Sequence, residues 1–124
     1  MPSKNRLQVG DVMSSPVETI APTASVQKAA QQMQAKDVSA LLVRTSTAGI
    51  ITSTDVVTAV ADGNDLSSVE VSEVMTAAIE TVTPELDLDE AAAMMTTYDI
   101  KHLPVVDDDY IGMLSSSDMT AVLT

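Results

Sequence analysis

The chain repeats itself once, and this repeat constrains its fold more than any other feature of the sequence. The segment VMSSPVETIAP at residues 12–22 returns as VMTAAIETVTP at residues 74–84. Later positions match in the same order: Ala29, Ala30, Met33, Leu41 and Val43 return as Ala91, Ala92, Met95, Leu103 and Val105. A unit of this size buries a core poorly when it is alone. We therefore expect two copies of one supersecondary unit, at residues 9–62 and 71–124, packed about a pseudo-two-fold axis.

Each copy has the pattern of a strand, a helix, two strands and a final helix. In the first copy, a β-rich run at residues 17–20 precedes a helix with Ser25 as its N-cap and Met33 on its buried stripe. In the second copy, Asp87 and Glu90 have the spacing of a capping box at the start of the equivalent helix. The following strands and helices are expected at residues 40–44, 48–52 and 54–61, and at 103–106, 110–115 and 117–123. The predicted fold class is α/β (α+β), with the order β-α-β-β-α in each copy.

The charge balance excludes several classes of function. The chain has 18 Asp and Glu against 6 Lys and Arg, a net charge of -12, so it would repel a nucleic-acid backbone. It has no cysteine, which excludes disulfides and thiol nucleophiles. No apolar run approaches the ~20 residues that span a bilayer, and the N-terminus leads into no apolar signal region. We expect a cytoplasmic protein that binds neither nucleic acid nor membranes.

The acidity itself has two interpretations, and both stay open. One is an ordinary acidic bacterial protein. The other is a halophilic protein from a high-salt cytoplasm, where the screening length falls to ~3 Å at 1 M salt. The scarcity of lysine favours the second interpretation.

The motif Gly-x-x-Thr/Ser-x-x-Asp occurs at the same place in both copies, ending at Asp55 and at Asp118. Its hydroxyl residues stand at the start of a helix, where free backbone N–H groups and the helix dipole favour an anion such as phosphate. The aspartate can accept hydrogen bonds from two adjacent hydroxyls, as a ribose presents. A simpler alternative is that the hydroxyls cap the helix and the carboxylate offsets its dipole. The hydroxyl residues of the two motifs are Thr52 and Thr54, and Ser115 and Ser117.

The two copies differ most just before the second strand. Lys101 and His102 stand where the first copy has Ser39 and Ala40. Lysine is a compact charge that suits phosphate, and histidine can donate a hydrogen bond in either charge state. The alternative is that Lys101 extends into solvent and His102 caps a strand. If both copies bind ligand, the two sites are expected to differ.

Other candidate sites fail on spacing. Residues 107–109 are three aspartates, but no calcium-loop spacing follows them, so an exposed hairpin turn is the better interpretation. His102 is the only histidine, and no second histidine or cysteine stands near it to complete a metal site or a catalytic triad. We therefore predict no catalytic residue and no metal site, and we expect that the protein is not an enzyme.

Together these features resemble the tandem cystathionine-β-synthase (CBS) domain pair, also called a Bateman module. The resemblance is carried by the sequences DVM at residues 11–13, VSALLV at 38–43 and HLPVVD at 102–107, and by the repeated Gly-x-x-Thr/Ser-x-x-Asp motif. The first copy departs from the family at Leu42, where proline is usual, and at residues 44–45, where Val-Asp is common. The second copy therefore matches the family pattern more fully than the first.

The resemblance implies a regulatory module that requires no cofactor. Many such pairs bind adenine nucleotides or S-adenosyl compounds in two clefts between the copies, and they commonly form homodimers. The ligand-binding residues that it implies are Val17, Ser39, Ala40, Thr52, Thr54, Asp55, Ile79, Lys101, His102, Ser115, Ser117 and Asp118. We expect a stand-alone sensor of an adenosyl ligand that alters contacts with an unknown regulated protein. The alternative is an interaction or scaffold module whose pockets are vestigial.

Overall fold

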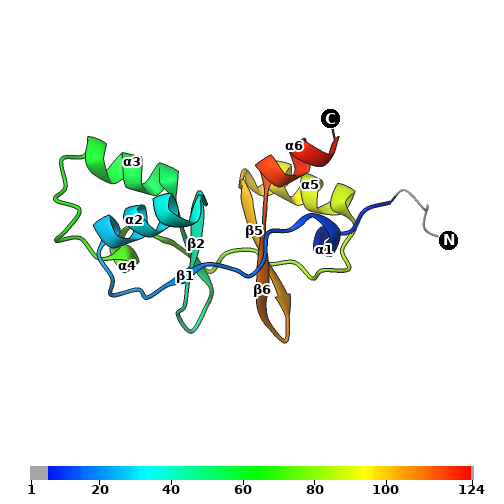
Figure 1. Ribbon diagram of the computed structural model, residues 1–124, viewed down its shortest axis with the longest axis horizontal. Coiled ribbons are helices and arrows are strands. Elements are labelled where there is room, and N and C mark those ends of the chain that lie inside the picture. The colour runs from blue at the N-terminus through cyan, green and yellow to red at the C-terminus, as the bar shows by residue number, and fades with distance from the viewer. Residues whose placement is uncertain (1–5, 124) are drawn as a thin grey trace. The chain divides into compact units, whose positions relative to one another are not determined.

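The computed structural model describes residues 6–123, and the chain divides into two compact units. One unit, here called the central unit, is Glu18–Ile79. The other, here called the terminal unit, joins the N-terminal residues up to Val17 to the residues from Glu80 onward. Figure 1 shows the central unit in light blue to green, and the terminal unit in dark blue and in yellow to red. The predicted mixed α+β fold is confirmed, with helices and strands in each unit.

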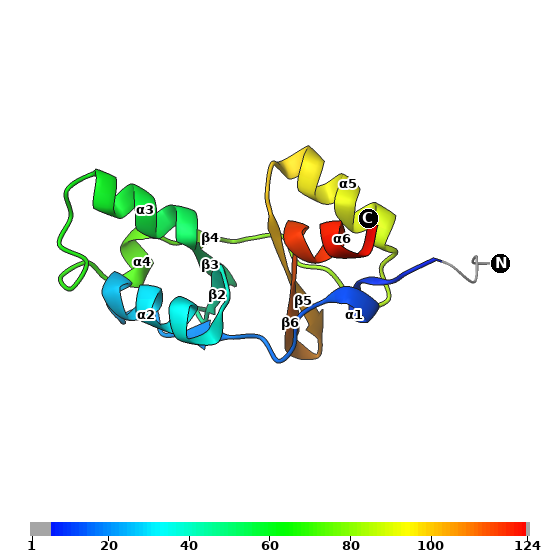
Figure 2. The same ribbon diagram turned by 45° about the horizontal axis from the view of Figure 1, so that its top comes forward.

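The central unit is a four-stranded sheet with two longer helices. The strands are β1 (Thr19–Ile20), β2 (Ala40–Val43), β3 (Gly49–Thr52) and β4 (Thr76–Ala77), in the order β1-β2-β3-β4. The strands β1 and β2 are parallel, and the other two pairs are antiparallel. The helices are α2 (Val26–Lys36), α3 (Ser53–Ala61) and the short α4 (Val71–Val74). In Figures 1 and 2, α2 and α3 lie on the same face of this sheet. The core between them includes Val26, Ala29, Met33, Leu41, Val43 and Ile51.

The terminal unit repeats this arrangement with a smaller sheet. Its elements are α1 (Val9–Val12), α5 (Leu88–Tyr98), β5 (His102–Asp107), β6 (Asp109–Ser115) and α6 (Ser116–Leu123). The strands β5 and β6 form an antiparallel hairpin. Two isolated β-bridges take the place of the outer strands of the central unit. Val82 forms a parallel bridge with Val105, and Ser14 forms an antiparallel bridge with Met113. The core includes Val9, Leu88, Ala91, Met95, Leu103, Val105 and Leu114.

Each unit contains the opening segment of the other sequence copy. In the terminal unit, the N–H groups of Val9 and Gly10 donate to the carbonyls of Leu86 and Pro84, both at 2.9 Å. In the central unit, the N–H groups of Val71 and Ser72 donate to the carbonyls of Ala24 and Pro22, at 2.8 and 3.0 Å. These are the same contacts at equivalent repeat positions. The compact units therefore do not follow the sequence copies, because the short helices α1 and α4 are exchanged between them.

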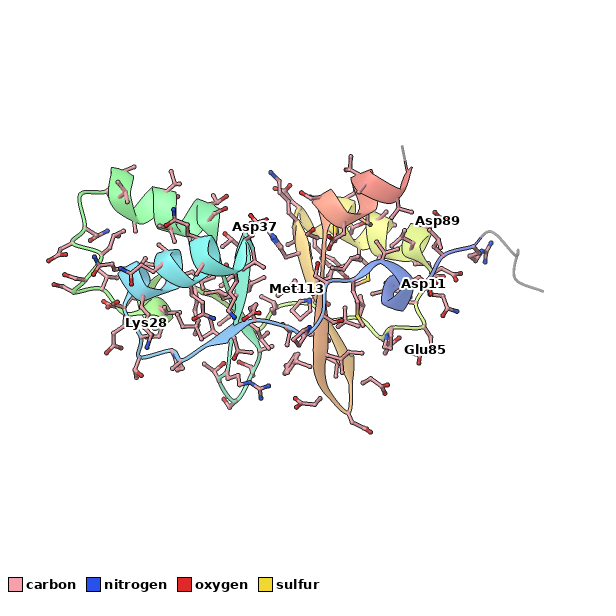
Figure 3. The ribbon with its side chains drawn as sticks, in the orientation of Figure 1. Asp11, Lys28, Asp37, Glu85, Asp89 and Met113 are labelled. Carbon is pink, nitrogen blue, oxygen red and sulfur yellow. The ribbon has the colours of Figure 1, made fainter. Side chains whose placement is uncertain are left out.

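The glycines that open the two motifs make room for these exchanged segments. A Cβ atom on Gly112 would lie 2.8 Å from the carbonyl oxygen of Ser14, and one on Gly49 would lie 3.3 Å from that of Thr76. Figure 3 labels Met113, which lies on β6 beside the segment that follows α1. Another backbone segment thus comes close to the strand glycine in both units, as the missing side chain of glycine allows.

The helices α2 and α5 begin and end where local sequence signals place them, with one exception. The predicted N-cap Ser25 is confirmed, since its Oγ accepts a hydrogen bond from the Lys28 N–H at 3.0 Å. Both helices end at an aspartate in the left-handed conformation, Asp37 (φ 55°) and Asp99 (φ 53°), a conformation that aspartate tolerates better than most residues. The predicted capping box at Asp87 is wrong: Asp87 is the N-cap residue of α5 but makes no side-chain cap. Its carboxylate instead pairs with Arg6 at 3.0 Å.

Two further differences concern short elements. The first strand expected in the second copy is reduced to the single bridge at Val82, opposite the place where a β-bulge between Val105 and Val106 shifts the register of β5. The helices α1 and α4 were not expected, because four residues are too few to show a helical period. Three methionines, Met33, Met94 and Met95, are expected to fill the core; Met33 and Met95 are buried, and Met94 is partly buried against the core of the terminal unit.

None of the helices within residues 6–123 is long and apolar enough to cross a membrane.

Candidate functional site

The predicted ligand-binding residues divide into two sets, one in each unit. The central set is Ser39, Ala40, Thr52, Thr54, Asp55 and Ile79, and the terminal set is Val17, Lys101, His102, Ser115, Ser117 and Asp118. In each set, one residue comes from the other sequence copy: Ile79 in the central set and Val17 in the terminal set. The exchange of opening segments thus decides which predicted residues share a unit.

Most of the central set gathers where β3 runs into α3. Ala40 opposes Thr52 across the β2–β3 pair, and the Ser53 N–H donates to the Ser39 carbonyl at 2.9 Å. These contacts hold the start of α3 against the start of β2. Thr54 is exposed on the first turn of α3.

The Asp55 carboxylate belongs to the N-cap of α3. Its Oδ2 accepts hydrogen bonds from the Thr52 backbone N–H at 2.8 Å and from the Thr52 hydroxyl at 3.1 Å. The Thr52 Oγ1 in turn accepts from the Asp55 N–H at 3.4 Å. This is a capping box, in which each residue satisfies a backbone donor of the other.

The terminal set repeats this geometry where β6 runs into α6. His102 opposes Ser115 across the β5–β6 hairpin, and the Ser116 N–H donates to the Lys101 carbonyl at 2.9 Å. The Asp118 Oδ2 accepts from the Ser115 N–H at 2.9 Å, and the Ser115 Oγ accepts from the Asp118 N–H at 3.1 Å. The two sets therefore present the same arrangement of hydroxyl and carboxylate at equivalent places.

These bonds limit what each helix start can offer to an anion. The first and third N–H groups of α3, those of Ser53 and Asp55, donate within the protein, and the same holds for Ser116 and Asp118 in α6. The capping role that the sequence left as an alternative is thus present in both units. It occupies Oδ2 of each aspartate, and a carboxylate has about four lone-pair sites over two oxygens. The Thr/Ser-x-x-Asp spacing is the sequence signal of this box.

Val17 and Ile79 are placed differently from the rest of their sets. The Ile79 N–H donates to the Ala48 carbonyl at 3.3 Å, which puts Ile79 at the start of β3. Thr52 ends the same strand, about 13 Å further along at ~3.3 Å per residue. Val17 is half-buried in the segment between the Ser14 bridge and β1. The structure therefore brings together four residues of the central set, Ser39, Ala40, Thr52 and Asp55, without Ile79.

The electrostatics of the two sets differ because of position 102. Burial lowers the pKa of His102 below its ordinary value; the nearby Asp118 carboxylate raises it, and Lys101 lowers it further. The imidazole therefore favours its neutral form near neutral pH. In the central unit, the uncharged Ala40 takes the place of His102, and Ser39 takes the place of the exposed Lys101.

Within the part of the chain that the structure describes, no three His, Asp or Glu side chains gather closely enough to hold a metal ion.

Comparison with known proteins finds a matching family model and relatives that align with nearly all of this chain. The family model described as "CBS domain" matches residues 9–62 and 71–124. The chain is 37% identical over 122 residues to a homoserine O-acetyltransferase of Methanohalophilus mahii, and the match covers 94% of this chain but 24% of that enzyme. The chain thus spans about a quarter of the length of this relative.

Solved structures give the same fold over nearly the whole chain. A hexameric CBS-CP12 protein from bloom-forming cyanobacteria superposes with a TM-score of 0.88 at 30% identity, over 94% of this chain and 67% of that one. The CBS domain pair of protein MJ0100, solved in complex with 5′-methylthioadenosine and S-adenosyl-L-methionine, superposes with a TM-score of 0.86 at 28% identity. That match covers 95% of this chain and 96% of the other.

Proposed function

The chain belongs to the CBS domain family, whose paired domains are regulatory modules, and on that premise we propose that it senses an adenosine-containing ligand. The ligand would be an adenine nucleotide or an S-adenosyl compound. Binding would change the contacts that the chain makes with another protein. The complex of the MJ0100 domain pair with two adenosyl compounds supports this choice of ligand class.

The observation that carries the proposal is the duplicated cluster of hydroxyl and carboxylate at a strand-to-helix junction. Asp55 and Asp118 each keep one oxygen, Oδ1, outside the capping bonds described above. A carboxylate oxygen held in a fixed position can accept hydrogen bonds from the adjacent hydroxyls of a ribose. The capping box would then orient the aspartate for its ligand, so that the structural role and the binding role are compatible.

A scaffold module with vestigial pockets is the second candidate, and one observation favours it. The capping boxes account for Thr52, Asp55, Ser115 and Asp118 without any ligand. If capping is their only role, the chain would act through its protein contacts alone.

Titration of AMP and adenosine into single variants separates the two candidates. Charge-assisted hydrogen bonds contribute about 1.5–3 kcal/mol each, so Asp55→Ala and Asp118→Ala should each weaken binding roughly ten- to a hundredfold at their own site. Lys101→Ala should weaken AMP binding and leave adenosine nearly unchanged, because only AMP carries a phosphate. The titrations are made by calorimetry at one fixed salt concentration.

Ser25→Ala is the matched control for these variants. It removes the cap of α2, which lies outside both sets, so it should lower stability without lowering affinity. If both aspartate variants bind AMP like the parent protein, the ribose assignment is wrong and the result favours the scaffold module. If only the helix caps matter, Ser25→Ala and Asp55→Ala should lower the melting temperature alike with no change in affinity.

We further propose that the chain forms a homodimer through α3. Val57 and Val60 are 66% and 57% exposed on this helix, although valine is usually buried. The exposed residues of α3 carry no charge: Ser53, Thr54, Val57, Thr58, Val60 and Ala61. In a chain of net charge -12, two copies repel each other least where the surface is uncharged. The exposed uncharged face of α3 is therefore the surface on which we expect a second copy to pack.

A further inference from the structure

The longer helices of each unit form a layer whose outer side is exposed. In the central unit α2 packs against α3, and in the terminal unit α5 packs against α6 (Figure 2). These two pairs of helices are here called the central layer and the terminal layer. Within residues 6–123, four of the five exposed large hydrophobic side chains lie on them: Val57 and Val60 on α3, Tyr98 on α5 and Val122 on α6. Exposed apolar side chains that gather on one surface mark a site of association.

The exposed charges of the two layers are of opposite sign. Lys28 and Lys36 are exposed on α2, which has no acidic residue. Asp89 and Glu90 are exposed on α5, which has no basic residue. Glu90 occupies the same position of the repeat as Lys28. One position of the repeat therefore carries opposite charges in the two copies.

The second helix of each layer does not change this difference. The helices α3 and α6 carry one charged residue each, Asp55 and Asp118, and both are half-buried and bonded in their capping boxes. The central layer thus combines two lysines with one carboxylate, whereas the terminal layer has three carboxylates and no cation.

These charges distinguish two ways of pairing the layers in a homodimer. If like layers pair, the carboxylates of one terminal layer face those of the other. If unlike layers pair, each contact brings the lysines of one copy to Asp89 and Glu90 of the other. Opposite charges attract and like charges repel, so the charges favour the pairing of unlike layers.

We propose that a second copy of this chain packs its terminal layer on the central layer of the first, so that the contact joins unlike units. In a closed dimer the same contact occurs twice, once for each central layer. This inference rests on the homodimer proposed above. It adds which helices of the second copy cover α3: they are α5 and α6, and not a second α3.

Cross-linking measures the pairing directly, because the chain has no cysteine of its own. Val57 on α3 and Thr120 on α6 are exposed and occupy the same position of the repeat. The variants Val57→Cys and Thr120→Cys are treated with a short bismaleimide, each alone and in an equimolar mixture. We expect cross-linked dimer from the mixture and only the collision level from either variant alone. Ser46→Cys, which is exposed between β2 and β3 and lies outside both layers, measures that collision level.

Charge variants of α5 give a second readout from the affinity of the dimer. Asp89→Asn combined with Glu90→Gln removes the carboxylates that unlike pairing places beside lysines. At about 0.1 M salt, this variant should weaken the dimer roughly tenfold in sedimentation equilibrium. Like pairing predicts a tighter dimer, because the same change relieves repulsion. Asp107→Asn combined with Asp108→Asn, at the exposed tip of the β5–β6 hairpin, is the matched control: it changes the net charge equally and should not weaken the dimer.

The outcomes separate this proposal from the homodimer on which it rests. Cross-linked dimer above the collision level from Val57→Cys alone, or from Thr120→Cys alone, overturns unlike pairing and leaves the homodimer standing. A tighter dimer after removal of the two carboxylates of α5 overturns it as well. If the parent protein sediments only as a monomer, the homodimer fails and this proposal fails with it. The binding of AMP and adenosine is measured separately and depends on none of these results.

Discussion

Replacing Gly112 by alanine should loosen the exchanged N-terminal segment from β6. A Cβ at this position would lie 2.6 Å from Met13 Sδ and 2.8 Å from the Ser14 carbonyl oxygen, both closer than real Cβ atoms approach. The methionine side chain can rotate away. The Ser14 oxygen cannot, because it accepts from the Met113 N–H at 3.0 Å while the Ser14 N–H donates to the Met113 carbonyl at 2.9 Å.

The expected loss in the free energy of unfolding is the sum of three contributions, and it can be compared with the loss at the equivalent glycine. Overpacking costs about 1–3 kcal/mol, and loss of the two backbone hydrogen bonds adds about 0.5–1.5 kcal/mol each. Alanine recovers about 0.4–1 kcal/mol by restricting the unfolded chain. We expect Gly112→Ala to lower the free energy of unfolding by about 3 kcal/mol. At Gly49 the contacts are longer, 3.0 Å to Met75 Sδ and 3.3 Å to the Thr76 oxygen, so Gly49→Ala should cost about 0.5 kcal/mol.

Urea denaturation of both variants measures this difference, and amide exchange at Met113 locates it. The double variant Met13→Ala with Gly112→Ala removes the sulfur contact but not the contact with the Ser14 oxygen, so it should recover only part of the loss. Equal costs at Gly49 and Gly112 would refute the argument from close approach. Full recovery in the double variant would show that the sulfur, and not the backbone, is the obstacle.

Two further predictions concern association and salt. Val57→Glu places a charge on the exposed uncharged face of α3 and should convert a homodimer to monomer in sedimentation equilibrium at micromolar concentration, whereas Ala93→Glu, at an exposed position of α5, should not. A parent protein that sediments only as a monomer contradicts the dimer. The melting temperature should rise from low to molar salt, because screening relieves the repulsion among 18 carboxylates that only 6 cationic side chains balance. A melting curve that does not change with salt removes the argument for a high-salt origin.

The exchanged segments change how variants in this chain are interpreted. Val9 and Ser14 belong to the first sequence copy but pack in the terminal unit. A substitution there is expected to perturb the terminal set rather than the central set. The same reasoning links Val71 and Thr76 to the central unit.

Local sequence patterns were enough to predict the longer elements and the chemistry of the two motifs. The helix α2 was predicted from the cap at Ser25 and the buried stripe that includes Met33, because both signals lie within one or two turns. The Thr/Ser-x-x-Asp spacing showed that hydroxyl and carboxylate meet at a helix start, although capping and ligand binding share that spacing. The difference between His102 and Ala40 was also visible from the repeat alone.

Only the tertiary structure decided which distant segments meet. Nothing near Asp87 in the sequence shows that its carboxylate would pair with Arg6 instead of capping α5. The repeat predicted two copies but not that α1 and α4 pack in the unit of the other copy, since this depends on hydrogen bonds such as that from Val9 to Leu86. The lowered pKa of His102 likewise depends on burial, which outweighs the opposing effect of Asp118 on a different element. Short-range periodicity and capping act within a few residues, whereas burial and segment exchange depend on contacts between residues far apart in the chain.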